Sequence, residues 1–371
     1  MAIHTLNSCL LNRLFKITYI SMIIYMKNIS LSFLVLTIVI LNACKKNNSE
    51  APIPRKVYPV TAAVAGQWRQ MLDTFNIEII DALSFSIGDN GYTINQRTNA
   101  IYSYSAKSNM VVRKKNFPGE RRQSDATVFV IGNKAYYGLG VGQRSIKEGT
   151  QTEWQYQYFL DFWEYDPNSD EWTQKKPFHV PSATEVHSFL GAYGFGIGNK
   201  GFIGSGRDYH FAVLPYLFEY NPASDTWIER TSDADVNNYG PKYASVTLAF
   251  SINGKGYVGD STHLWEYTPG TNTWKDLKET PGAIKQPVIA LGGKTKGYIY
   301  GSLNSLNSFD PVLKNEFYEY VPSSNKWNKL KDFGGSARAS CSGFILNDKV
   351  FIGFGSDLNA SVLGDVWEYT P

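Results

Sequence analysis

The chain has 371 residues, of which 15% are aromatic and 19% are charged, and only three are cysteines. This composition is too apolar for a disordered protein and too poor in cysteine for a disulfide-stabilised scaffold. Residues 1–44 contain three basic residues and no acidic ones, so the rest of the chain balances 33 basic against 33 acidic residues. A neutral body without a basic stripe excludes a nucleic-acid partner.

The N-terminal segment has the features of an export signal. Thirteen almost entirely apolar residues, 29–41, follow Lys27 and precede the sequence Leu41-Asn42-Ala43-Cys44. A helix of that length rises about 20 Å, which is too short for the hydrocarbon core of a membrane but suits a signal peptide. The tetrapeptide resembles a bacterial lipobox, whose cysteine is lipidated. We therefore expect a leader over residues 1–44, a lipid anchor at Cys44 and a location in the cell envelope, on a bacterial membrane. An uncleaved anchor and a plain secretory signal are the alternatives.

The segments around this leader carry little fold information. Met26 is an ordinary start for such a signal, so residues 1–25 are interpreted as an upstream extension. Residues 45–62 are polar and contain proline, which is typical of a tether. With Cys44 lipidated, Cys341 is the one cysteine left in the body, and no internal disulfide is expected.

One phrase recurs through the body at intervals of 55, 47, 53 and 49 residues. It consists of an aromatic residue, Glu and Tyr, then a turn, then a Trp placed seven residues after the Tyr. The Tyr and Trp pairs are Tyr165 and Trp172, Tyr220 and Trp227, Tyr267 and Trp274, and Tyr320 and Trp327, and the last copy ends at Tyr369. Such regular repetition predicts one structural unit per copy.

Each unit has the pattern of four β-strands. A hairpin with Gly or Asn in its turn precedes each phrase, as in Ala192–Gly206 and Ser342–Ser356. These residues tolerate the positive φ of tight hairpins. The phrase itself supplies two further strands around its turn. Four antiparallel strands in about 50 residues are typical of a propeller blade.

The units resemble kelch repeats, the family that includes the central domain of galactose oxidase. In kelch repeats a glycine pair closes the second strand, and Tyr and Trp follow at this spacing. Here the glycine pair becomes Gly-x-Gly, as at Gly138 and Gly140. The resemblance implies a propeller in which the repeated Tyr and Trp side chains pack blade on blade.

A degenerate unit raises the number of blades to six. It contains Tyr104, with Val111 at the position of the Trp. The sixth unit ends at Pro371 without its fourth strand, and Trp68 lies in an isolated strand-like segment near the N-terminus. We therefore expect an all-β, six-bladed β-propeller of kelch type over residues 63–371, with the ring closed by the N-terminal strand around Trp68.

Long insertions fall at one end of the predicted blades, between the second and third strands or between one blade and the next. These two kinds of connection emerge on the same rim of a four-stranded meander, here called the long-loop rim. Because loops on a rigid scaffold often carry function, we expect the binding face there. Its candidate ligand-binding residues are Arg338, Arg207, Asp208, Tyr209, His210, His187, Trp154 and Tyr156.

Two interpretations of these candidates stay open. Exposed aromatic rings beside charged groups suit a sugar or a peptide, but the rings could also fold back over the blade ends. The kelch resemblance implies that Arg338, and Arg121 or Arg122 in the second blade, point toward the mouth of the channel. Salt bridges between blades are the alternative for these arginines.

The sequence contains no HxH, HExxH, GxSxG or P-loop motif. Two kelch-type enzymes are nevertheless alternatives. Copper oxidases of the galactose oxidase type need a cysteine linked to a tyrosine and two histidines, for which Cys341, His187 and His210 are the candidates. Sialic-acid mutarotases with six blades use arginines and acidic groups at the channel mouth and hold no metal.

We therefore predict a membrane-anchored, extracytoplasmic binding module, monomeric and without metal or cofactor. It would present the long-loop rim to a glycan or to a protein of the cell envelope. The alternative is a carbohydrate-active enzyme of mutarotase or oxidase type. Acid–base pairs converging on one pocket would favour the enzyme, and a broad aromatic surface would favour binding.

Overall fold

The computed structural model describes most of the predicted propeller. It covers residues 63–73, 78–148, 151–178, 189–204, 206–208, 210, 214, 216–231, 248–259, 263–281, 288–303 and 312–371. The leader with Cys44 and the tether lie outside these residues. Within the described residues, no helix is long and apolar enough to cross a membrane.

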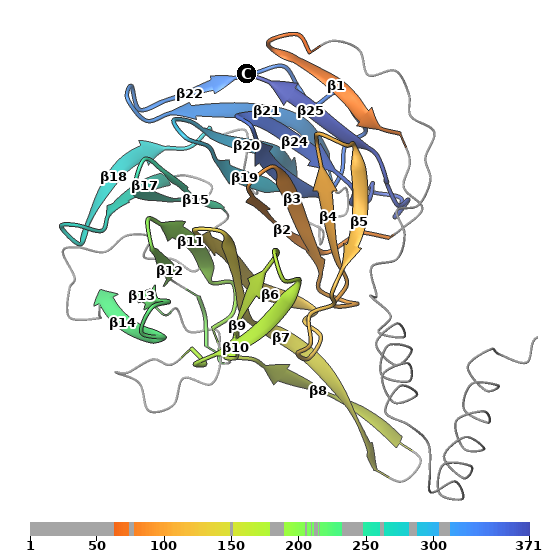
Figure 1. Ribbon diagram of the computed structural model, residues 1–371, viewed down its shortest axis with the longest axis vertical. Coiled ribbons are helices and arrows are strands. Elements are labelled where there is room, and N and C mark those ends of the chain that lie inside the picture. Colours follow the sequence, from red (N-terminus) through yellow and green to blue (C-terminus); the bar gives the residue numbers. More distant parts are fainter. Residues whose placement is uncertain are drawn as a thin grey trace, which may run out of the picture. The chain divides into compact units, whose positions relative to one another are not determined.

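The described elements are β-strands arranged in six antiparallel sheets (Figure 1). Blade 1 contains β2 (Ala82–Ile87), β3 (Asn90–Asn95), β4 (Ile101–Ser105) and β5 (Met110–Lys114). Blade 2 contains β6 (Ser124–Ile131), β7 (Lys134–Glu148), β8 (Gln151–Tyr158), β9 (Phe162–Asp166) and β10 (Glu171–Lys175). Blade 3 contains β11 (Tyr193–Ile197), β12 (Lys200–Gly204), β13 (Leu217–Asn221) and β14 (Thr226–Thr231).

The second half of the ring repeats this plan. Blade 4 contains β15 (Leu248–Ile252), β16 (Lys255–Gly259), β17 (His263–Thr268) and β18 (Thr273–Glu279). Blade 5 contains β19 (Ile289–Gly292), β20 (Gly297–Leu303), β21 (Leu313–Val321) and β22 (Lys326–Lys329). Blade 6 contains β23 (Ser342–Leu346), β24 (Lys349–Gly353), β25 (Val366–Thr370) and β1 (Gln67–Leu72).

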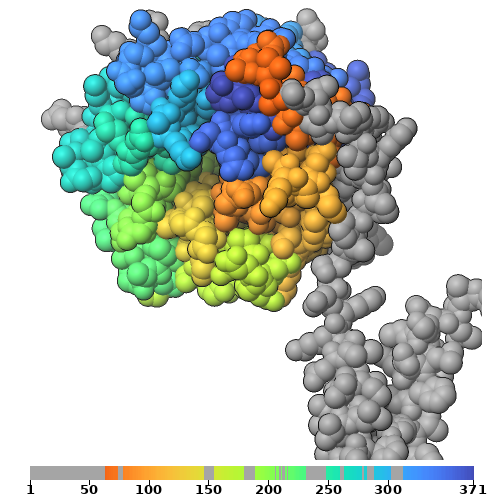
Figure 2. Space-filling view, turned by 45° about the horizontal axis from the view of Figure 1, so that its top comes forward, coloured from red at the N-terminus to blue at the C-terminus, as the bar shows by residue number. Residues whose placement is uncertain are grey.

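The first strand of each blade lies innermost. β2, β6, β11, β15, β19 and β23 contact one another in that order, and β23 returns to β2, so the blades close into a ring. Figure 2 shows the blades as successive colour blocks around that ring. Aromatic side chains fill the spaces between neighbouring blades, as where the rings of Tyr136 and Tyr220 lie 5.5 Å apart. The predicted six-bladed β-propeller is confirmed.

The ring is closed by the N-terminal strand, as predicted. β1 pairs with β25 in an antiparallel register that places Trp68 opposite Tyr369. The same register joins Tyr and Trp in blades 2 to 5, and joins Tyr104 to Val111 in blade 1. The seven-residue spacing is thus the distance between cross-strand partners around one four-residue turn.

Each turn after a third strand also ties its blade to the preceding one. In blade 2 the hydroxyl of Tyr165 donates to Asp170, whose carboxylate accepts the backbone N–H of Lys115 from blade 1. In blade 4 the corresponding residue is Asn272, whose amide donates to the backbone carbonyl of Arg230 in blade 3. Asp therefore occurs where the neighbour offers an N–H group, and Asn where it offers a carbonyl.

A buried or half-buried Glu in the repeated phrase pairs with a Lys that opens the second strand. In blade 2, Lys134 Nζ lies 2.7 Å from Glu164, which is also bonded by the hydroxyl of Tyr136. The other pairs are Lys200 with Glu219, Lys255 with Glu266, Lys296 with Glu319, and Lys349 with Glu368. Blade 1 lacks both partners and has Asn90 and Ser103 at these positions.

One segment expected to be a loop is regular instead. β7 continues beyond its blade and pairs with β8, so residues 142–148 and 151–158 form a two-stranded ribbon that reaches away from the ring (Figure 1). The alternation of Trp154, Tyr156 and Tyr158 with polar residues suits such a ribbon.

Candidate functional site

The long-loop rim is described only in part, and its candidates have different environments. His187 and Tyr209 lie outside the described residues. Arg207 follows β12, and its backbone forms two hydrogen bonds with Leu190, at 2.8 and 2.9 Å. These bonds fix the segment after β12 against the segment that precedes β11.

The side chain of Arg207 is half-buried. No hydrogen bond or ion pair joins its guanidinium to another described residue. The neighbouring Asp208 accepts the backbone N–H of His210 at 2.9 Å, which fixes the start of the next turn, and His210 is exposed. Arg207 is therefore held in place by its backbone, and its guanidinium has no anionic partner among the residues that the structure describes.

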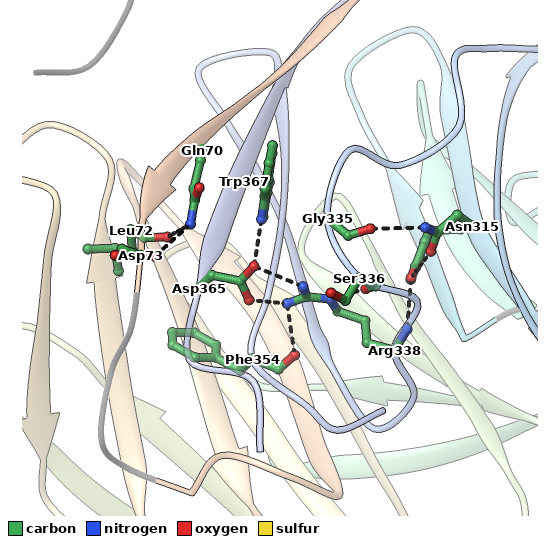
Figure 3. Close-up of polar contacts among 11 residues, drawn as sticks. Gln70, Leu72, Asp73, Asn315, Gly335, Ser336, Arg338, Phe354, Asp365 and Trp367 are labelled. Atoms are coloured by element: carbon green, nitrogen blue, oxygen red, sulfur yellow. Dashed lines mark hydrogen bonds and ion pairs between the residues drawn. The ribbon is translucent and has the colours of Figure 1, made fainter. Parts of the chain in front are cut away.

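Arg338 lies in a different environment, because its side chain is fully buried. Figure 3 shows its polar contacts. It donates to both carboxylate oxygens of Asp365, at 2.6 and 3.0 Å, and to the carbonyls of Ser336 and Phe354. The guanidinium also lies 4.9 Å from the ring of Phe333. These contacts hold blade 6 to the loop that precedes it, so the interpretation of Arg338 as a salt-bridging residue fits its environment.

Arg122 repeats this arrangement in blade 2. It is fully buried, forms an ion pair with Asp161 and donates to the carbonyl of Leu139 at 2.9 Å. Its guanidinium lies 3.8 Å from the ring of Phe159. In both blades the acidic partner also accepts an indole N–H from the strand that follows it, at Trp163 here. Arg122 and Arg338 are thus two copies of one structural device.

The sequence analysis missed a set of residues at the start of the innermost strands. Asp81, Asp125, Gly191 and Ser340 hold equivalent positions in blades 1, 2, 3 and 6, and all four have positive φ. The sequence contained a signal for these positions. In blades 1 and 2 an Asp, Asp81 or Asp125, stands three residues before Ser84 or Val128 of the innermost strand.

Two of these residues bring charge to the rim. Asp81 forms an ion pair with Arg97 and accepts a hydrogen bond from the hydroxyl of Ser340 at 2.8 Å. A Cβ atom at Gly191 would lie 3.7 Å from Oδ1 of Asp125. Gly191 directly follows Leu190, to which Arg207 is bonded, so Asp125 and Arg207 lie in the same sector of the rim.

Trp154 and Tyr156 are strongly exposed, by 67% and 61%. They lie on one face of the ribbon, opposite Ser145 and Gln143 of β7. These rings do not fold back over the blade ends. They form an aromatic surface on a projecting arm.

The copper alternative requires a cluster of metal ligands. No three His, Cys, Asp or Glu side chains within them gather closely enough to hold a metal ion. Burial raises the pKa of the Cys341 thiol to about 12, so the thiol stays protonated at neutral pH. His187, the other copper ligand considered, lies outside the described residues.

The described cavity does not open on the long-loop rim. Its volume is about 630 Å³, and it opens at the opposite end of the channel, where the first and second strands of the blades are joined. The end of the channel with the cavity and the end with the long loops are therefore two separate candidate surfaces.

The chain is similar to sialic-acid enzymes over short segments. It is 30% identical over 106 residues to the N-acetylneuraminate epimerase of Haemophilus influenzae (strain PittEE), which covers 29% of this chain and 28% of that protein. It is 33% identical over 57 residues to the protein of that name from Pasteurella multocida (strain Pm70), which covers 15% of each chain. The chain thus spans less than a third of the length of these relatives. No family model matches it.

The similarity in structure extends further than the similarity in sequence. The solved structure titled "Structure of YjhT" matches with a TM-score of 0.60 at 15% identity, covering 80% of this chain and 96% of that chain. At this identity the match shows the fold alone. That fold is the six-bladed, kelch-like propeller.

Proposed function

We propose that the propeller binds N-acetylneuraminate at the long-loop rim and catalyses the interconversion of its anomers. The observation that carries this proposal is the 30% identity over 106 residues to an N-acetylneuraminate epimerase. The geometry adds a cation, Arg207, without an ion-pair partner among the described residues, and a carboxylate, Asp125, in the same sector. The mutarotase alternative of the sequence analysis is therefore preferred to pure binding.

The reaction needs an anion-binding group and an acid–base group. Arg207 would bind the substrate carboxylate, since a guanidinium offers paired donors to two oxygens. Asp125 would take the proton of the anomeric hydroxyl while the bond between the anomeric carbon and the ring oxygen breaks, and would pass that proton to the ring oxygen. Rotation about the freed carbonyl group and reclosure then give the other anomer.

The test is the rate at which a solution of one anomer reaches equilibrium, followed by proton NMR. The protein should accelerate this rate above the uncatalysed value. Arg207→Gln should weaken substrate binding, and Asp125→Asn should lower kcat by about 10²-fold or more. Lys107→Gln, which removes a charge from an exposed turn, is the matched control and should leave the rate unchanged. An uncatalysed rate with the unmodified protein would refute the proposal.

A binding role without turnover is the second candidate, favoured by the exposed rings of Trp154 and Tyr156. A glycan or an envelope protein held by the β7–β8 ribbon would be released by Trp154→Ala with no change in folding. We further propose that the body lies outside the cytoplasm on a lipid anchor at Cys44, as a monomer. Membrane fractionation and sedimentation test these two points.

A further inference from the structure

The channel at the end opposite the long-loop rim has a wall of unusually small residues. Aligned on their hairpin turns, the six innermost strands each contribute two residues to it, which form two layers. The inner layer contains Ser84, Val128, Gly194, Ala249, Ala290 and Gly343. The outer layer contains Ser86, Val130, Gly196, Ser251, Gly292 and Ile345. None of these twelve side chains is charged or aromatic.

The cavity of about 630 Å³ lies within this wall, and eleven of the twelve residues line it. Its volume falls in the range of sites for small ligands, about 300–1,000 Å³. The opening, here called the hairpin mouth, is surrounded by the turns between first and second strands. The hairpin mouth therefore has the size of a binding site.

The wall presents peptide groups and hydroxyls. A Cβ atom at Gly196 would meet the carbonyl oxygen of Val130 at 1.8 Å, and one at Gly292 would meet that of Ser251 at 2.2 Å. Glycine is thus required because neighbouring strands approach so closely. The hydroxyl of Ser86 accepts the N–H of Ile345 at 3.1 Å and keeps its own O–H as a donor.

Polar and charged side chains surround the opening. Asp89, Asn253 and Asn347 stand on turns of three blades, and Lys294 of blade 5 pairs with Asp348 of blade 6 at 2.9 Å. Two carboxylates against one ammonium leave the mouth slightly acidic, which disfavours an anion. Carboxylates, amides and an ammonium are together suited to neutral hydroxyl groups, which both donate and accept.

We propose that the hairpin mouth is a second ligand site, separate from the long-loop rim, which binds a neutral monosaccharide. The wall of small residues gives a sugar ring room to enter, and its hydroxyls and peptide groups match the sugar hydroxyls. The charged turns hold the exposed side of the ring. An anionic sugar is disfavoured by the net negative charge of Asp89, Asp348 and Lys294.

The experiment uses the full-length protein and a panel of glucose, galactose, N-acetylglucosamine and N-acetylneuraminate. Saturation-transfer NMR and titration calorimetry measure binding. At least one neutral sugar should bind, and Ala290→Leu, which narrows the channel, should abolish its binding. Lys294→Met should weaken binding about tenfold. Lys115→Met removes a similarly exposed ion pair with Glu171 on the outer strands and should have no effect.

Three results would overturn the proposal: no neutral sugar binds, binding survives in a folded Ala290→Leu protein, or N-acetylneuraminate binds in a way that Lys294→Met weakens. If Ala290→Leu does not fold, Lys294→Met decides the outcome, because Lys294 is 78% exposed and its loss leaves the core intact. Failure of this proposal leaves the epimerase proposal untouched, since that site is tested through Arg207 and Asp125.

Discussion

Replacing Trp68 by alanine should weaken the pairing of β1 with β25, which closes the ring. The indole packs against Phe317, Phe333 and Tyr369 at centroid distances of 4.9 to 5.2 Å and donates to the carbonyl of Lys331. Truncation of a core Trp costs about 3–5 kcal/mol, and partial exposure of this one places the cost near the lower value.

The expected shift in melting temperature follows from the size of the domain. With about 2.1 cal/mol/K per residue, roughly 310 residues unfold with an entropy near 0.65 kcal/mol/K, so about 3 kcal/mol lowers Tm by about 5 °C. Circular dichroism on heating measures this shift. Trp154→Ala removes an indole that is 67% exposed and should change Tm by less than about 1 °C. Equal melting of Trp68→Ala and the unmodified protein would refute the role of β1 in closure.

Further predictions concern stability and location. Burial raises the pKa of Glu164, but hydrogen bonds from its Lys and Tyr partners outweigh it and leave the pKa lowered. Stability should therefore decrease as the pH falls below about 4.5, and Glu164→Gln should reduce that dependence of the urea midpoint. Asp225→Asn should fold with near-normal stability, because Asn accepts the same bonds and tolerates positive φ, whereas Asp225→Ala should lose about 1–2 kcal/mol in urea unfolding. Arg338→Met leaves Asp365 without its ion-pair partner and should cost about 3 kcal/mol by the same measurement, and Arg338→Lys should not restore the stability fully. Cys44→Ala should release the protein from membranes; persistent sedimentation with them would indicate an uncleaved helix.

The fold could be predicted because its decisive signals are local and repeated. A Tyr and a Trp seven residues apart must face each other once the turn between them is tight. Each copy of the phrase therefore defines the register of its third and fourth strands. The closing strand was also predictable, since Trp68 was the one such Trp without a preceding phrase.

The environments of individual side chains were harder to predict. Arg338 is buried because Asp365, 27 residues away and outside the repeated phrase, meets both of its terminal nitrogens. The ribbon was expected as a loop because it lies outside the repeated phrase. The cavity exists because all six innermost strands carry small side chains. These strands are distant in sequence, so no single repeat predicts the cavity.

The pairing of the first strand with the last also sets an order of events. Arg69 and Glu368, joined across β1 and β25, are 299 residues apart. In a chain that emerges N-terminus first, β1 appears early, but Glu368 of its partner strand follows 299 residues after Arg69. Local hairpins can form early, whereas closure waits for the most distant contact. The ring therefore stays open until β25 has emerged, and it closes in a single late step when β1 and β25 pair.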